Sequence, residues 1–93
     1  MSPEDLLERV VDRDSFIAFA RELAAERWEA EQMERDDPVA FSLGGALGWQ
    51  NGDIAGFLEA ALRYFEPSPL WRPEDRPSWR MFAEFLHFGK IYE

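Results

Sequence analysis

The stretch SWRMFAEFLHFGKIYE, residues 78–93, decides the fold because its apolar side chains cover most of the circumference of a helix. One apolar side is formed by Trp79, Phe82, Ala83 and Leu86. A second side, next to the first, is formed by Met81, Phe85, Phe88 and Tyr92. A helix of this kind is normally buried on two sides. We therefore expect this segment to be the central helix of a bundle, or alternatively to use its second side as the interface of a homodimer.

Other segments carry helix start and stop signals. Ser2 is a suitable N-cap for a short helix over residues 3–10. Asp12 can cap a longer helix, which the sequence Asp36-Asp37-Pro38 should end. Arg27 falls in the middle of the apolar stripe of that long helix, so either the core ends before it or its charge is paired.

The second half of the chain is read in the same way. Residues 38–48 contain three glycines and predict a short helical turn followed by a loop. Apolar residues recur at helical spacing over residues 53–65. Prolines between residues 67 and 77 exclude a helix there, and we expect Leu70 and Trp71 to lay an extended connection over the core. The chain is therefore predicted to be all-α, a small bundle of about four helices in a single domain, 1–93, with the C-terminal helix central.

Composition excludes several classes of protein. The chain has no cysteine, which removes disulfides, thiol catalysis and thiolate metal sites. No apolar run approaches the ~20 residues of a membrane span. The opening residues Met-Ser-Pro-Glu-Asp lack the cationic start of a signal peptide. We expect a cytoplasmic protein.

The net charge of −9 is unevenly distributed, since residues 1–37 hold 12 Asp and Glu against five Arg. Such a surface repels phosphate backbones, so we expect neither nucleic-acid nor membrane binding. A basic protein partner would instead be attracted and steered toward it. Solubility alone is a sufficient alternative reason for the charge.

An acidic row runs along the long helix, formed by Glu22, Glu26 and Glu29 at i, i+4 and i+7. Like charges at this spacing repel one another unless a positive group lies nearby. That group could come from the same chain, from among Arg9, Arg13 and Arg35. Alternatively, the row could bind a basic partner, with two apolar anchors beside it, Trp28 and Met33.

Catalytic signals are weak. Glu84 and His87 have the i, i+3 spacing of di-iron carboxylate bundles, but one histidine could serve such a site only across a two-fold dimer. We favour a solvent-facing strip in which Arg80 pairs with Glu84. The chain has five serines, no threonine and no cysteine, and two of the serines, Ser2 and Ser78, are placed as helix caps, so it offers no evident nucleophile. We predict no catalytic residue, no metal and no cofactor.

Four short motifs occur together: Trp49-Gln50-Asn51, Phe57-Leu58-Glu59-Ala60, Trp79-Arg80-Met81-Phe82-Ala83 and Ile91-Tyr92-Glu93. In this combination the chain resembles a family of small, mostly bacterial proteins of uncharacterised function. The resemblance implies a helical fold and suggests that four residues lie together: Trp49, Asn51, Trp79 and Tyr92. They would form the rim of the core or, alternatively, the wall of a ligand pocket.

Two functions follow from these patterns. The first is a small acidic protein-interaction module, similar to an immunity protein or an adaptor, that binds another protein through the acidic row. The second is a small-molecule-binding protein or enzyme that uses the aromatic cluster around Trp49, Trp79 and Tyr92.

Overall fold

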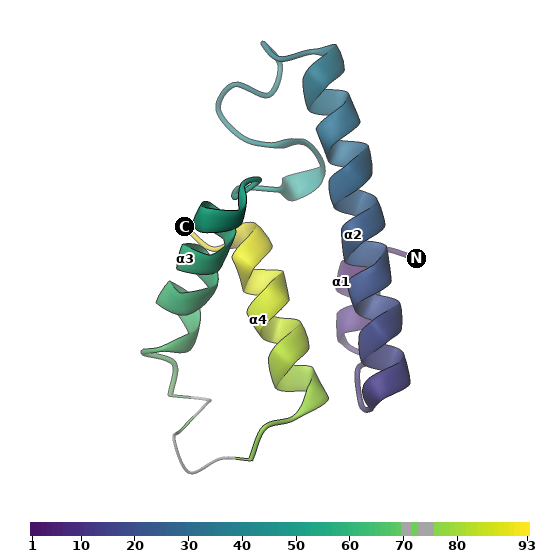
Figure 1. Ribbon diagram of the computed structural model, residues 1–93, viewed down its shortest axis with the longest axis vertical. Coiled ribbons are helices and arrows are strands. Elements are labelled where there is room, and N and C mark those ends of the chain that lie inside the picture. Colours follow the sequence, from purple (N-terminus) through teal and green to yellow (C-terminus); the bar gives the residue numbers. More distant parts are fainter. Residues whose placement is uncertain (70–71, 73–75) are drawn as a thin grey trace.

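The regular structure of the described residues is entirely helical (Figure 1). The computed structural model describes residues 1–69, 72 and 76–93. Its helices are α1 (Pro3–Leu7), α2 (Arg13–Asp36), α3 (Ile54–Phe65) and α4 (Trp79–Ile91), with a short 3₁₀ helix, η1 (Ala46–Gly48). The predicted all-α class is confirmed, whereas Leu70 and Trp71 lie outside the described residues. None of the described helices is long and apolar enough to cross a membrane.

Each of the described α-helices begins with an N-cap, as the sequence predicts for Ser2 and Asp12. The side chains of Ser2, Asp12, Asp53 and Ser78 each accept a hydrogen bond from the backbone N–H three residues later. These bonds satisfy amide groups that a helix leaves unpaired in its first turn. The first helix is shorter than expected and ends at Leu7, because the chain then turns to bring Val10 into the core.

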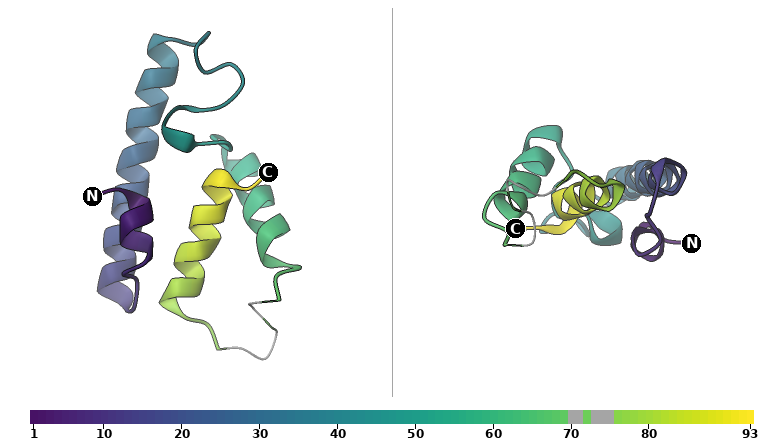
Figure 2. Two further views of the ribbon diagram at one scale, coloured as in Figure 1. Left: turned by 180° about the vertical axis from the view of Figure 1, so that it is seen from behind. Right: turned by 90° about the horizontal axis from the view of Figure 1, so that it is seen from below.

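α4 is the central helix, as predicted. α3 packs on one side of it, and α2 and α1 pack on the other (Figure 1). Seen from the end, α3, α4 and α2 follow one another in a row, with α1 displaced to one side of that row (Figure 2). The molecule is therefore a slab, with extents of 45 × 27 × 17 Å. It has two broad faces, of which α1 covers part of only one.

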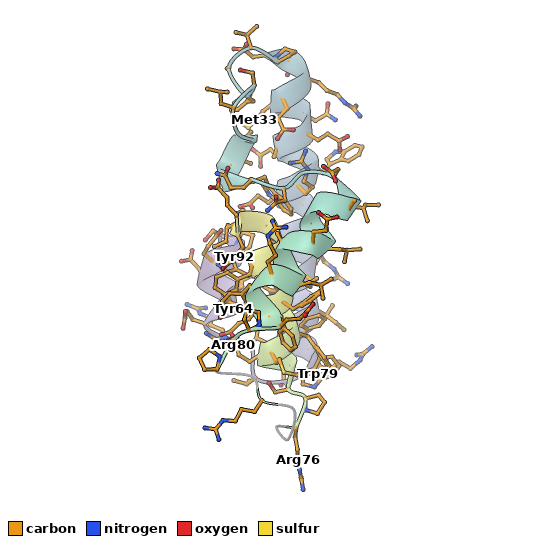
Figure 3. The ribbon with its side chains drawn as sticks, turned by 90° about the vertical axis from the view of Figure 1, so that its left-hand side faces the viewer. Met33, Tyr64, Arg76, Trp79, Arg80 and Tyr92 are labelled. Carbon is orange, nitrogen blue, oxygen red and sulfur yellow. The ribbon has the colours of Figure 1, made fainter. Side chains whose placement is uncertain are left out.

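We call the face without α1 the open face. Its apolar side chains come from three helices and are Ala20, Ala24 and Trp28 of α2, Trp79 and Phe82 of α4, and Ile54, Leu58 and Leu62 of α3. The edge-on view places Trp79 toward the opposite side of the slab from Tyr64, Arg80 and Tyr92 (Figure 3). Phe82 is 44% exposed, although the sequence placed it on a side of the helix that we expected to be buried.

Close packing of α3 on α4 depends on small residues. Ala60, Ala61 and Ala83 are fully buried, and a Cβ added at Gly89 would lie 2.7 Å from the ring of Phe57. Only a glycine at position 89 lets that ring reach the backbone of α4. The two helices consequently meet with little between their backbones.

The second apolar side of α4, predicted as a possible dimer face, is largely occupied within the chain. Phe88 stacks on Tyr64 with ring centroids 3.6 Å apart, and Phe85 meets Phe65 edge-on at 5.8 Å. Met81 is partly buried, and Tyr92, the most exposed of the four, packs edge-on against Tyr64. This correction follows from the position of α3, which the helical wheel of α4 alone could not give.

Candidate functional site

The most buried charge among the described residues is that of Lys90, the chain's one lysine, in the last turn of α4. Its side chain is 2% exposed, and its Nζ lies 2.6 Å from Glu26 Oε1 and 2.7 Å from Glu4 Oε1. α1 and α2 thus each supply one carboxylate to the same ammonium group. Sequence reasoning missed this residue, although Lys90 falls on the same apolar side of the helix as Ala83 and Leu86.

Trp49 completes this cluster. Its indole Nε1 donates a 2.9 Å hydrogen bond to Glu26 Oε1, and Lys90 Nζ lies 5.7 Å from the centre of its ring. A buried ammonium is tolerated when opposite charges and hydrogen bonds replace its water shell. We call Glu4, Glu26, Trp49 and Lys90 the buried lysine cluster.

The cluster perturbs the acid–base behaviour of Glu4. Partial burial acts to raise the pKa of Glu4, but its hydrogen bonds, the strongest from Lys90, together with nearby positive charge, outweigh that effect. The pKa of Glu4 is consequently lowered. Glu4 is therefore ionised at neutral pH and holds α1 against α4.

The charge of Arg27 is paired with Glu34. Of the two alternatives that the sequence left open for Arg27, a paired charge is therefore the correct one. Its guanidinium binds both oxygens of Glu34, at 3.1 and 2.8 Å, and lies 5.3 Å from the centre of the Trp49 ring. Glu34 also accepts a hydrogen bond from the backbone N–H of Ala46, and these bonds lower its pKa. Arg27 and Glu34 thus fix the glycine-rich segment before η1 against α2.

The Trp49-Gln50-Asn51 turn binds the end of α4. The side-chain amide of Asn51 donates to the carbonyls of Gly89 and Tyr92, at 3.1 and 2.8 Å. The backbone N–H groups of Gln50 and Asn51 both donate to the carbonyl of Lys90. Helix ends leave carbonyls without intrahelical partners, and this turn satisfies them. Asn51 therefore caps the carbonyl end of α4.

The aromatic residues predicted to lie together are separated. Trp49 and Asn51 lie at the C-terminal end of α4, near Tyr92. Trp79 begins the same helix, about 20 Å away at 1.5 Å per residue, where its ring packs on Phe16. The predicted pocket wall of Trp49, Trp79 and Tyr92 is therefore not one site.

The acidic row is divided in the same way. Glu26 turns inward to Lys90, whereas Glu22 and Glu29 are exposed and make no ion pair within the described part of the chain. They border a shallow hollow lined also by Met1 and Leu47. The positive group that the row required is Lys90, not one of the three arginines proposed for it.

The two apolar anchors predicted beside the row lie in different directions. Trp28 is 66% exposed and lies about 100° around α2 from Glu29, on the side of Ala24. Met33 is 36% exposed and lies closer to the direction of the row. Trp28 therefore lies on the open face. Of the two predicted anchors, only Met33 lies beside the acidic row.

His87 lies between helices α4 and α1 and is half-buried. Burial lowers the pKa of His87; Glu4, Glu84 and Glu26 act to raise it, and Lys90 acts to lower it. Its Nδ1 is buried without a hydrogen-bond partner in the described structure. Glu84 binds Arg80 at 3.1 Å, as predicted. Across residues 1–69, 72 and 76–93, no three acidic or histidine side chains converge as metal ligands would.

A groove opens on the open face between α2 and α3. It has a volume of about 320 Å³ and an almost wholly apolar wall, with Ala20, Leu23 and Ala24 on one side and Ile54, Phe57 and Leu58 on the other. Arg27 and the turn from Trp49 to Asp53 close one end. The groove carries the largest uncovered apolar side chains of α3, so it is the candidate binding surface. Comparison with protein families, curated proteins and solved structures finds no match to this chain.

Proposed function

We propose that the chain is a protein-interaction module that binds through its open face. The observation that carries this proposal is the amount and kind of surface left uncovered. The accessible area is 6289 Å². A compact monomer of this mass is expected to expose about 5,600 Å², so the chain as a whole exposes about 700 Å² more than expected.

The composition of the face supports the same conclusion. Large apolar side chains there remain substantially exposed, among them Trp28, Ile54, Leu58, Leu62 and Phe82. Contiguous apolar surface that spans several elements is typical of interaction sites and unusual on an isolated monomer. Aromatic residues such as Trp28 and Phe82 are also the kind that anchor interfaces.

The polar groups of the chain support a structural role more than catalysis. The charged side chains that converge most closely, Lys90 with Glu26 and Arg27 with Glu34, neutralise one another at hydrogen-bond distance. A general acid or base needs a free position facing a substrate. These groups instead hold α1, η1 and α4 on α2.

The test uses the absence of cysteine from the sequence. Leu62→Cys, labelled with a benzophenone maleimide, places one photo-crosslinker on the open face. Ala18→Cys places the same group on the outer side of α2. We expect cross-linking to protein from Leu62→Cys, and not from Ala18→Cys, in extracts of cells that naturally make the chain. Equal cross-linking from both positions, or none from Leu62→Cys, would contradict the proposal.

A basic partner for the acidic row is a second version of this function, in the manner of an immunity protein. It is supported by Glu22 and Glu29, which are exposed and make no ion pair with other described residues. The charge reversals Glu22→Lys and Glu29→Lys should abolish capture of such a partner while the fold is kept. Glu26 is left unchanged in this test because it binds Lys90.

The groove also supports binding of an apolar small molecule. Its volume of about 320 Å³ lies at the lower end of the range of ligand sites. Titration with an environment-sensitive apolar dye would detect such a site. Leu58→Asp should then remove the fluorescence increase, and a dye response unchanged by Leu58→Asp would exclude the groove.

A further inference from the structure

The two long edges of the open face carry opposite charges. On α2, Arg13 pairs with Asp14, Arg27 with Glu34 and Arg35 with Glu31, whereas Arg21 makes no ion pair with any described residue. On α3, Glu59 is exposed and forms no ion pair within the described residues, so the pair with Arg63 that its spacing favours is not made. The α2 edge is thus positive at Arg21, and the α3 edge is negative at Glu59.

These two charges lie at the same height along the slab. Ala20 and Ala24 of α2 and Leu58 of α3 line the same groove, so these parts of the two helices lie beside each other. Arg21 follows Ala20 in the sequence, and Glu59 follows Leu58. Each of the two lies on the outer side of its helix. They are therefore level with each other, on opposite edges of one apolar face.

From this arrangement we propose that the open face binds a second copy of this chain, related by a two-fold axis that runs along α4 in the plane of the face. A rotation of 180° about that axis leaves each residue at the same height along the slab and exchanges the α2 edge with the α3 edge. α2 of one copy then lies over α3 of the other, and Arg21 of each meets Glu59 of the other. The proposal rests on the proposed function and names the partner of the same face.

The area fits an interface of this kind. In a two-fold dimer the same patch is buried on both copies. A standard interface buries about 800 Å² on each partner, and the broad face of a slab 45 Å long and 27 Å wide is large enough to supply that area. Two slabs, each 17 Å thick, would form a two-layer helical bundle with the apolar groove in its interior.

The charges at the two edges fit a second copy better than a partner of one sign, although the net charge of −9 repels a second copy at longer range. A basic partner lying across the face would meet Arg21, and an acidic one would meet Glu59. A copy of the chain satisfies both edges at once. The exposed acids Glu22 and Glu29 lie toward the other broad face, bordering the hollow with Met1 and Leu47, where they do not oppose the contact.

The experiment is sedimentation velocity of the wild-type chain from about 1 to 200 μM, combined with charge reversal. We expect a monomer–dimer equilibrium, weakened roughly tenfold by Arg21→Glu or by Glu59→Arg, because each reversal affects both symmetry-related pairs. The double variant Arg21→Glu/Glu59→Arg should restore the wild-type dissociation constant to within about threefold, since opposite charges meet again.

Matched controls separate the pair from net charge. Arg9→Glu and Glu22→Arg change the net charge by the same amounts outside the open face, and should leave dimerisation unchanged. Circular dichroism establishes that each variant is folded. A wild-type chain that stays monomeric at 200 μM, a double variant that dimerises no better than the singles, or control variants as weak as the test variants would each overturn the proposal.

The outcomes also separate this inference from the proposed function. A monomeric chain whose Leu62→Cys probe cross-links a different protein removes the second copy as partner and leaves the interaction module. A chain that cross-links to nothing through that probe removes both. Cross-linking of the purified chain to itself through Leu62→Cys, and not through Ala18→Cys, supports both.

Discussion

Lys90 Nζ lies 2.6 Å from Glu26 Oε1, so the last turn of α4 is tied to the middle of the longest helix. Glu4 reaches the same ammonium from α1, and Trp49 donates to the same carboxylate. Three helices and the turn after η1 therefore meet at one buried ion pair. Removal of this ion pair should therefore lower the stability of the whole fold.

Lys90→Met should strongly destabilise the chain. The change keeps the length of the apolar stem but leaves Glu26 partly buried with no cation beside it. Loss of one partner from a buried pair typically costs about 3–5 kcal/mol in the free energy of unfolding. Urea denaturation monitored by circular dichroism measures it, with the exposed Arg63→Met as control. A loss below about 1 kcal/mol would show that the cluster contributes little.

Stability should fall between pH 7.5 and 5.5 because of His87. The pKa of His87 in the folded chain lies below its usual 6.5, so the unfolded state binds a proton first as the pH falls. The contribution of neutral His87 is complete above pH 6.5 and is lost below it. Glu4, whose lowered pKa lies below 4.5, remains ionised throughout this range.

His87→Gln provides the comparison for that measurement. The variant should show a smaller loss of unfolding free energy from pH 7.5 to 5.5 than the wild-type chain. Equal pH dependence in the two proteins would assign the titration to another group.

Gly45→Ala should displace the loop before η1. A Cβ at Gly45 would overlap the carbonyl oxygen of Trp49 and lie 2.9 Å from Glu34 Oε2. We expect a loss of about 1–3 kcal/mol, as for overpacking in a core. Gly44→Ala is the matched control, because its added Cβ meets only the side chain of Gln50, at 3.6 Å. Thermal unfolding of the two variants would refute this account if both were equally stable.

Asn51→Ala should loosen the end of α4. The change removes two hydrogen bonds to the carbonyls of Gly89 and Tyr92, worth about 1–2 kcal/mol together. Amide hydrogen exchange in the last turn of α4 should become faster than in α3. Gln50→Ala, which keeps the backbone hydrogen bond, should not change it. Unchanged exchange in Asn51→Ala would mean that the backbone bonds alone hold the turn.

Local signals in the sequence were sufficient to predict the helices. The caps Ser2, Asp12, Asp53 and Ser78 act within three residues of their own positions, so sequence spacing predicts them. The pairing of Arg80 with Glu84 is local for the same reason. The alternative that Arg27 is paired also came from its position in an apolar stripe.

The candidate site depends on contacts between distant residues, which spacing does not give. Glu26 lies 64 residues from Lys90, and Glu4 lies 86 residues from it. A charged residue inside an apolar stripe was the available signal for Lys90. The resembling motifs associate Trp79 with Trp49, but the length of α4 keeps their rings apart. The open face arises from how three helices line up, which no single helical wheel contains.

The buried lysine cluster also bears on how the chain unfolds. A fragment with α1 and α2 alone would hold Glu4 and Glu26 without their counter-ion, and a fragment with α3 and α4 alone would hold Lys90 without an anion. Neither half can keep its native interior by itself. Melting should therefore be cooperative, with no stable half-folded species, and the enthalpy from calorimetry should equal the van't Hoff value.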